Sequence, residues 1–318
     1  MTMNKILTGL VLGCIVLASC KKDHSKDNNP TAKLQKVTFR LGLVKSTGAF
    51  QTNSLHVNST TPDTSVTNYM DVLYYMVFDA QGNSLHNITQ SASDTAFGHY
   101  TDNLAPGTYT VAIAGGKSGL VIKPGNLSHQ YIYYQAITWE FNYPVPVPFD
   151  KDAFFYRGTL TVGSTAATQN ISLSRIVSKL VVNINDAIPN NATKAGVGLN
   201  YNANTYLVGD GSTGEYIVDA ILGFGEYRGY TFDVKSTDWG KTNYQMSTLF
   251  LPPSSPIPVT IYVSTPTTIL GQKVLSNVTG QPNKVTLLSG NLFGGSGGGG
   301  FQVAVDTAWN TPVVKTFP

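Results

Sequence analysis

Cys20 carries the clearest chemistry in this sequence, because a short apolar run ends immediately before it. The run occupies residues 6–17 and follows Lys5, and a charged segment begins directly after the cysteine at Lys21. A run of this length is too short to span a bilayer as a stable helix and has the proportions of a signal peptide. The sequence therefore predicts an exported protein that is processed close to residue 20.

The residues at this point, Leu17, Ala18, Ser19 and Cys20, resemble the lipobox of bacterial lipoproteins. The resemblance implies that the chain is cut before Cys20, that a lipid is attached to the sulfur, and that the new N-terminus is acylated, for example with palmitate. Several acyl chains make a stable anchor, because each buried methylene contributes about 0.8 kcal/mol. We therefore expect Cys20 to tether the protein to the outer membrane. An ordinary signal peptide with a chance cysteine is the alternative.

No other group of residues has the spacing of a catalytic or metal site. The five histidines are scattered, without an H-E-x-x-H motif or an i, i+4 pair. His86 and His99 could meet across a sheet, but we favour surface positions for both. No pair of carboxylates is selected by its spacing, and the other cysteine, Cys14, lies inside the signal segment. We expect neither an enzyme nor a bound metal or cofactor.

The composition indicates an exported β-rich protein with a neutral polar surface. Charged residues make up 12% of the chain and the net charge is +3. This charge is too small and too scattered to indicate a nucleic-acid partner. Residues 21–33 contain no large apolar side chain and are expected to form a flexible tether between the lipid and the fold.

From residue 34 onward, short apolar segments alternate in the manner of β-strands. Val37, Phe39, Leu41 and Leu43 recur every second residue and predict a half-buried strand, whereas the continuous run 72–78 predicts a central strand covered on both faces. Further strands are expected within residues 86–90, 104–116, 159–162, 170–173, 179–184, 248–251, 259–263, 284–288 and 301–305. Helical periodicity is not sustained anywhere, so the fold class is predicted to be all-β.

The domain prediction is two β-sandwiches in tandem after the tether. Residues 34–158 would form the first sandwich and residues 159–318 the second.

Aromatic side chains are concentrated between residues 131 and 156, and they admit two interpretations. Tyr133 and Trp139, with Trp239 from further along the chain, could form a platform on which sugar rings stack. We favour core filling instead, because large aromatic side chains dominate core burial in proteins generally.

Several segments, taken in order, resemble the fimbrillin superfamily of fimbrial subunits and anchor proteins from anaerobic Gram-negative bacteria. The segments are VLYYMVFDAQG from residue 72, LAPGTYTVAIAGG from 104, FFYRGTLTVG from 154, LSRIVSKLVVNINDAIP from 173, NKVTLLSGNLF from 283 and FQVAVDTAW from 301. The resemblance implies two transthyretin-like sandwiches, export to the cell surface as a lipoprotein, and no enzymatic activity. It also implies assembly by strand exchange, in which main-chain hydrogen bonds add one subunit's strand to another's sheet.

In this interpretation the protein is an anchor or accessory subunit of a fimbrium that serves cell adhesion. Its partners would be other fimbrial subunits, and a ligand on a host or bacterial surface is possible. The candidate donor strand contains Phe301, Val303 and Val305, predicted to point inward. We expect that proteolysis does not remove the first strand from the mature protein. Arg40, the candidate cleavage site, lies in the middle of this strand, and paired strands resist proteases. The alternative is a lipid-anchored glycan-binding protein of a polysaccharide uptake system.

Overall fold

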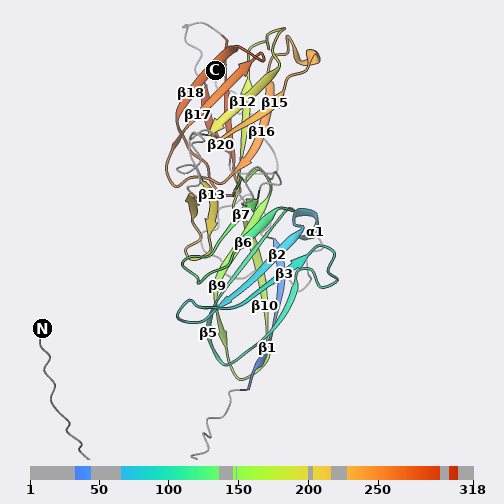
Figure 1. Cartoon of the computed structure of the whole chain (residues 1–318), viewed down its shortest axis with the longest axis vertical. Helices are drawn as coiled ribbons and strands as arrows, with labels where there is room; N and C mark the ends of the chain where they lie inside the picture. The colour runs from blue at the N-terminus through green and yellow to red at the C-terminus, as the bar shows by residue number, and fades with distance from the viewer. Residues whose placement is uncertain are drawn as a thin grey trace, which may run out of the picture. The chain divides into compact units, whose positions relative to one another are not determined.

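The structure is a computed structural model, and the described residues are 33–43, 66–135, 146–147, 149–199, 203–215, 228–293 and 301–306. The lipobox residues and Trp139 lie outside these ranges. Helix in the described part is limited to α1 (Val66–Tyr69) and the 3-10 turn η1 (Ser236–Asp238), so the prediction of an all-β fold is confirmed (Figure 1). None of the helical segments described here has the length and apolar character needed to cross a bilayer.

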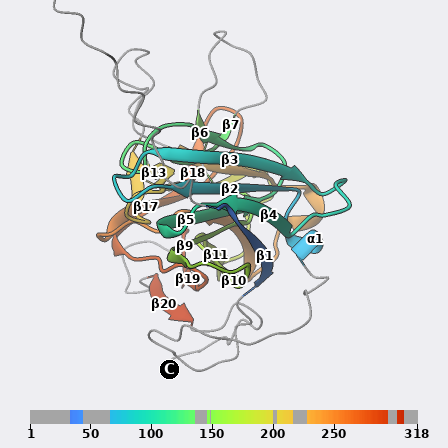
Figure 2. The ribbon, with the colours of Figure 1, turned by 90° about the horizontal axis from the view of Figure 1, so that it is seen from below.

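Seven strands are hydrogen-bonded in the order β3-β2-β5-β9-β10-β1-β4. Their bounds are β1 Gln35–Leu43, β2 Val72–Phe78, β3 Ser84–Ser91, β4 His99–Leu104, β5 Gly107–Gly116, β9 Ala153–Val162 and β10 Ala167–Arg175. Only two residue pairs join β9 to β10. We therefore treat β10, β1 and β4 as sheet A, and β3, β2, β5 and β9 as sheet B. Both sheets contribute side chains to one buried cluster, so they face each other as a sandwich (Figure 2).

Strand β2 lies inside sheet B and is covered on both faces, as its continuous apolar run predicts. Leu73, Tyr75 and Val77 belong to the core shared with sheet A, whereas Met76 and Phe78 belong to a second core on the opposite face. The two cores are possible because successive side chains of a strand point to opposite faces of the sheet.

The second face of sheet B is covered by sheet C, in which β13 and β14 come from much later in the sequence than their partners. Its strands are β6 Leu120–Lys123, β7 Tyr131–Gln135, β8 Pro146–Val147, β13 Ala203–Leu207 and β14 Thr213–Glu215. Tyr206 of β13 pairs with Ile132 of β7, and Val208 is buried in the shared core with Phe155. Sheets A, B and C form what we call the first lobe.

The second lobe is a sandwich of two four-stranded sheets. Sheet D has the order β16-β11-β19-β20 and sheet E the order β15-β12-β17-β18. Their bounds are β11 Ser178–Ile184, β12 Lys194–Leu199, β15 Arg228–Asp233, β16 Tyr244–Phe250, β17 Ile257–Ser264, β18 Ile269–Val278, β19 Val285–Gly290 and β20 Gln302–Asp306. A single apolar core, built around Leu180, Val197 and Ile261, fills the space between them.

Strand pairing does not follow the predicted domain boundary between residues 158 and 159. That position lies inside β9, whose ten residues all pair with β5. The polar turn at 163–166 then leads into β10, which lies beside β1 in sheet A. The first lobe therefore continues to Arg175 and also takes in residues 203–215.

Candidate functional site

The candidate donor strand, β20, lies at the edge of sheet D and pairs with β19 alone among the described strands. Phe301, which precedes it, is half-buried against the core of the second lobe, and Lys273 Nζ lies 5.7 Å from the centre of its ring. Val303 lies opposite the buried Leu288 but is 44% exposed, because this rim position leaves it uncovered. The predicted inward direction of Val303 therefore does not bury the side chain, and the side chain of Val305 lies outside the described residues.

Strand β1 has the opposite situation, because it is paired along both of its sides. It runs parallel to β10 and antiparallel to β4. Val37, Phe39 and Leu41 are between 0% and 3% exposed, and Arg40 points outward between His99 and Asn170. As predicted, the first strand completes a sheet of the first lobe.

The aromatic residues of β7 alternate between the core and the surface. Ile132 and Tyr134 are buried beneath sheet C, whereas Tyr131 and Tyr133 point to its other side and are half-buried. The Tyr131 and Tyr133 rings lie 5.7 Å apart, and Lys123 Nζ is 5.3 Å from the centre of the Tyr131 ring. Core filling is confirmed for Tyr134, Phe149, Phe154 and Phe155 but is wrong for Tyr131 and Tyr133.

The three residues of the predicted sugar platform do not lie on one described surface. Tyr133 belongs to sheet C of the first lobe. Trp239 follows η1 in the second lobe, is 40% exposed and donates a hydrogen bond from its indole Nε1 to the Ala192 carbonyl oxygen at 2.9 Å. Among the described residues, the aromatic neighbour of Tyr133 on this side of sheet C is Tyr131.

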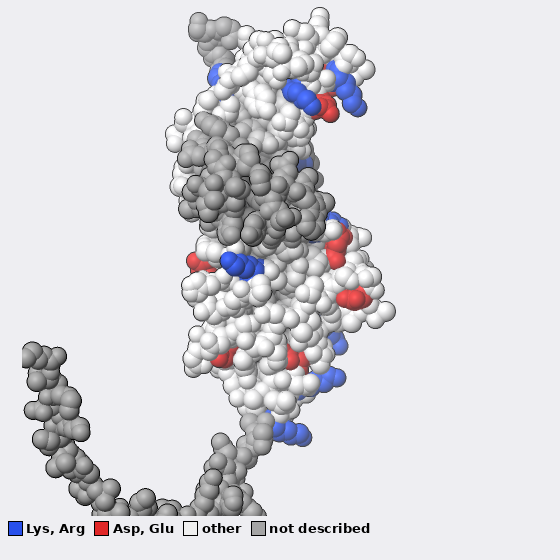
Figure 3. All heavy atoms as spheres, in the orientation of Figure 1, with Lys and Arg blue, Asp and Glu red and all other residues white. Residues whose placement is uncertain are grey.

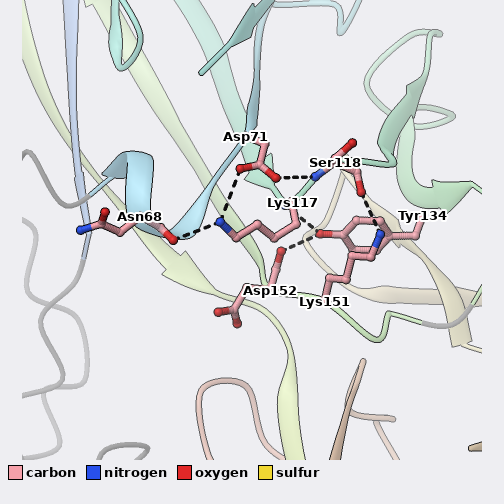
Figure 4. Close-up of polar contacts among 7 residues, drawn as sticks. All are labelled: Asn68, Asp71, Lys117, Ser118, Tyr134, Lys151 and Asp152. Atoms are coloured by element: carbon pink, nitrogen blue, oxygen red, sulfur yellow. Dashed lines mark hydrogen bonds and ion pairs between the residues drawn. The ribbon is translucent and has the colours of Figure 1, made fainter. Parts of the chain in front are cut away.

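A polar cluster that the sequence did not reveal joins α1 to the turn after β5 (Figure 4). Lys117 Nζ donates to the Asn68 carbonyl oxygen at 3.0 Å and lies 3.4 Å from Asp71 Oδ1. The second oxygen of Asp71 accepts the Ser118 backbone N–H at 2.9 Å. All of these donors and acceptors are used within the cluster, so it holds the backbone in place.

Tyr134 connects this cluster to β9. Its hydroxyl donates to the Asp152 carbonyl oxygen at 2.6 Å and accepts the Lys117 backbone N–H at 3.1 Å, and burial raises the pKa of the phenol above its usual range. Gly116 permits this approach, because a Cβ added there would lie 2.7 Å from the Tyr134 hydroxyl oxygen. Lys151 Nζ closes the cluster on the Ser118 carbonyl oxygen at 3.0 Å (Figure 4).

Arg175 extends these contacts from the first lobe to the second. Its Nε donates to Asp152 Oδ1 at 2.8 Å and its Nη2 to Asp152 Oδ2 at 3.2 Å, which makes a bidentate pair. Its Nη1 donates to Asn283 Oδ1 at 3.0 Å, and its guanidinium carbon lies 5.0 Å from the ring centre of Phe154. These contacts tie the end of β10 to the turn between β18 and β19.

His86 meets an acid and not the second histidine. Its Nδ1 lies 2.6 Å from Asp102 Oδ2, and the Asp102 side chain is only 8% exposed. Burial, together with the charge of Asp102 and a hydrogen bond to it, raises the pKa of Tyr100 to about 12. The pair joins β3 to β4, the outermost strands of the seven-stranded order, across the opening between sheets A and B.

Charged side chains are sparse on the face shown in Figure 3, where most of the described surface is neutral. Within the described residues, no group of three or more histidines, cysteines and acids is placed to hold a metal ion.

Two solved structures have similar folds. The fimbrial anchor protein Mfa2 from Porphyromonas gingivalis aligns over 86% of this chain and 98% of its own, with 11% identity and a TM-score of 0.50. A candidate cell adhesion protein from Bacteroides eggerthii aligns over 88% of this chain and 97% of its own, with 12% identity and a TM-score of 0.50. At such identities the likeness concerns the fold alone.

Sequence comparison gives the family. No curated protein sequence matches the chain at a significant level. The family model described as fimbrillin-A associated anchor proteins Mfa1 and Mfa2 matches residues 45–270, which is well over half of the 318 residues. This chain therefore belongs to the family of fimbrillin-A associated anchor proteins.

Proposed function

We propose that this protein is a surface lipoprotein that serves as an anchor or accessory subunit of a fimbrium. Membership of the family makes it an adhesion-related fimbrial protein of the cell surface, and not an enzyme. The lipid anchor at Cys20, the outer membrane location and assembly by strand exchange are the finer parts of the proposal.

The unequal pairing of β1 and β20 is the observation that supports a terminal position in a fimbrium. A donor strand must leave its own sheet at low cost, and β20 is held by β19 alone among the described strands. A subunit that accepts a donor needs a vacant strand position, but β1 occupies the space between β10 and β4. This chain would therefore give a strand to another fimbrial subunit and would not receive one in sheet A.

The lipid anchor would sit at the other end of the chain. Cys20 is followed by the polar segment 21–33, and β1 begins at Gln35. A cell-surface pull-down tests the whole proposal. We expect the wild-type protein to bring down a ladder of fimbrial subunits from membrane fractions. A chain that ends at residue 300 should stay in the membrane fraction without the ladder, and Cys20→Ala should be released or left uncleaved.

The mass of the protein from intact cells provides the control. A lipidated chain that begins at Cys20 and keeps β1 agrees with the proposal. A surface form that begins at Leu41 would make the protein an acceptor of donor strands, and recovery of the ladder with the truncated chain would rule out β20 as the donor.

Glycan binding is the second candidate function, and the outward pair Tyr131 and Tyr133 favours it. Two tilted aromatic rings beside Lys123 could stack on a sugar. Tyr133→Ala should then abolish binding to cell-wall polysaccharide without changing the melting temperature. The buried Phe155 is the control position, because its replacement should lower the melting temperature instead.

A further inference from the structure

The outer face of sheet A is polar and carries basic charges only. Its side chains alternate with the buried residues of the same strands, and the strand register places them side by side. They are Lys36, Thr38, Arg40 and Gly42 on β1, His99, Thr101 and Asn103 on β4, and Thr168, Asn170 and Ser172 on β10.

Within the described strands of sheet A, no acid lies on this face. Strands β1 and β10 contain none in their sequences, and the single acid of β4, Asp102, points inward to His86. Lys36 and Arg40 are both exposed, and they lie two residues on either side of Thr38. An anionic surface that approached Thr38, in the middle of the face, would therefore be attracted by both positive charges.

The neutral residues of the face are hydrogen-bonding groups suited to phosphate oxygens. Thr38 lies between Thr101 and Thr168, with 3.4 Å between the hydroxyl oxygens of Thr38 and Thr101. Arg40 lies between His99 and Asn170. A guanidinium group can bind a phosphate through two parallel hydrogen bonds, and hydroxyl and amide groups donate to the same oxygens.

We infer that this face docks on the anionic, phosphate-bearing surface of the membrane to which the protein is tethered. The inference rests on the anchorage at Cys20 in the proposed function. Fourteen residues, 21–34, separate Cys20 from Gln35, the first residue of β1. If this segment is the flexible tether that its composition predicts, a chain of that length would have a root-mean-square span of roughly 20 Å and would keep sheet A close to the headgroups.

Charge complementarity strengthens the choice of a membrane over a neutral glycan. Each Lys or Arg near an anionic leaflet is attracted to it, and the tether adds Lys21, Lys22, Lys26 and Lys33 against Asp23 and Asp27. The aromatic side chains of these strands that could stack on sugars, Phe39 and Tyr100, pack against the core. Docking would also cover Lys36 and Arg40, the two residues of β1 at which a trypsin-like protease could cut.

A fluorescence experiment on tethered protein tests the inference. Residues 21–318 contain no cysteine, so Thr38→Cys provides a single labelling position in the middle of the face. The labelled chain 21–318 is held on vesicles by an N-terminal histidine tag and a nickel-chelating lipid, and a headgroup quencher reports contact. We expect quenching on phosphatidylcholine vesicles with 30% phosphatidylglycerol, but not on phosphatidylcholine alone. Quenching should disappear in 1 M salt, where the screening length falls to about 3 Å.

The double variant K36Q/R40Q should weaken docking about 30-fold, because each basic side chain near an anionic leaflet contributes roughly fivefold. K194Q/K235Q, which removes two exposed lysines from the second lobe, should leave docking unchanged, and a label at Ser276→Cys on β18 should stay unquenched. Melting curves check that the variants are folded.

The inference would be overturned if the label at position 38 were quenched equally on neutral vesicles. It would also be overturned if K36Q/R40Q showed as much quenching as the protein without these substitutions. Because the tag supplies the attachment, the result does not depend on acylation of Cys20. A failure of lipidation and a failure of docking are therefore seen separately.

Discussion

β1 and β20 are the first and last strands of the described chain, and sheets hold them in contrasting ways. β1 is paired on both sides and inserts three covered apolar side chains into the core. β20 has one neighbour among the described strands, a half-buried Phe301 before it and an exposed Val303 within it. Because each ladder and each covered side chain must be lost when a strand leaves, the cost of departure is far higher for β1. The described part of the fold thereby contrasts a firmly held strand with a weakly held one.

Side-chain contacts at the edge strands of the two sandwiches show a similar contrast between the lobes. β3 and β18 are both edge strands, and each carries a basic residue that reaches the opposite sheet. His86 meets the buried Asp102, whereas Lys273 lies over the ring of Phe301. Inward-pointing basic groups discourage the pairing of edge strands between molecules. In the second lobe this contact involves Phe301, which would move with β20.

The largest expected effect in this comparison is that of Phe39→Ala in β1. The side chain is 1% exposed, so its removal should lower the free energy of unfolding by about 3–5 kcal/mol. Urea denaturation of residues 33–318, which contain all three cores, measures it. Thr38→Ala on the outer face is the control and should stay within about 0.5 kcal/mol of wild type. A loss below 1 kcal/mol for Phe39→Ala would contradict the permanent role of β1.

Hydrogen exchange should separate the two strands without any substitution. Amides of β20 should exchange through local opening, at least about 30-fold faster than those of β1, which should follow global unfolding. Mass spectrometry of peptides that cover residues 35–43 and 301–306 measures the difference. Equal protection of both peptides would show that β20 is as firmly held as β1.

Phe301→Ala should have a smaller effect, of about 1 kcal/mol on the free energy of unfolding, because the side chain is already partly exposed. The same urea titration applies, with Val303→Ser as a near-neutral control. A loss as large as that of Phe39→Ala would mean that Phe301 is an integral part of the second core, and the distinction between the two strands would fail.

The smallest expected effect concerns the rim of the first lobe at alkaline pH. Burial and Asp102 raise the pKa of Tyr100 from 10.0 to about 12, so the native state holds this proton more firmly than the unfolded state does. The resulting stability is complete below pH 10 and is lost as the pH rises through 12. Tyr100→Phe should therefore lose less stability than wild type between these values. Tyr100 is partly exposed, so solvent screening keeps the difference below about 1 kcal/mol. The free energy of unfolding of both proteins is measured against pH, and parallel profiles would contradict the assignment of this pH dependence to Tyr100.

Local periodicity predicted the strands well where one side-chain pattern dominates. The alternation in β1 and the continuous apolar run of β2 each gave the correct burial. The same reasoning could not distinguish Tyr133 from Tyr134, because aromatic residues occupy both faces of β7 and leave no contrast to read. Both are tyrosines, yet only Tyr134 is buried.

Contacts between distant segments left no trace in the sequence. β13 pairs with β7 across some seventy residues, and Arg175 meets Asn283 across more than one hundred. The sequence alone does not distinguish Asp102 from other polar residues of an outer strand. Its contact with His86 becomes evident only when β3 and β4 are placed facing each other. These pairings depend on how the sheets close, and the division at residue 158 missed β10 and the β13–β14 hairpin for the same reason.

The placement of β1 also determines how the first lobe would respond to mechanical load. A pull between the membrane and a bound partner would enter the fold at Gln35 and act along the axis of β1. The ladders to β10 and β4 run crosswise to that axis, so they would be sheared together and not peeled apart one bond at a time. Val37, Phe39 and Leu41 would have to slide out of the core in the same movement. Resistance to such a pull depends on the unfolding rate and not on equilibrium stability, and in a tethered fimbrial subunit this geometry would slow rupture at the point where the load enters.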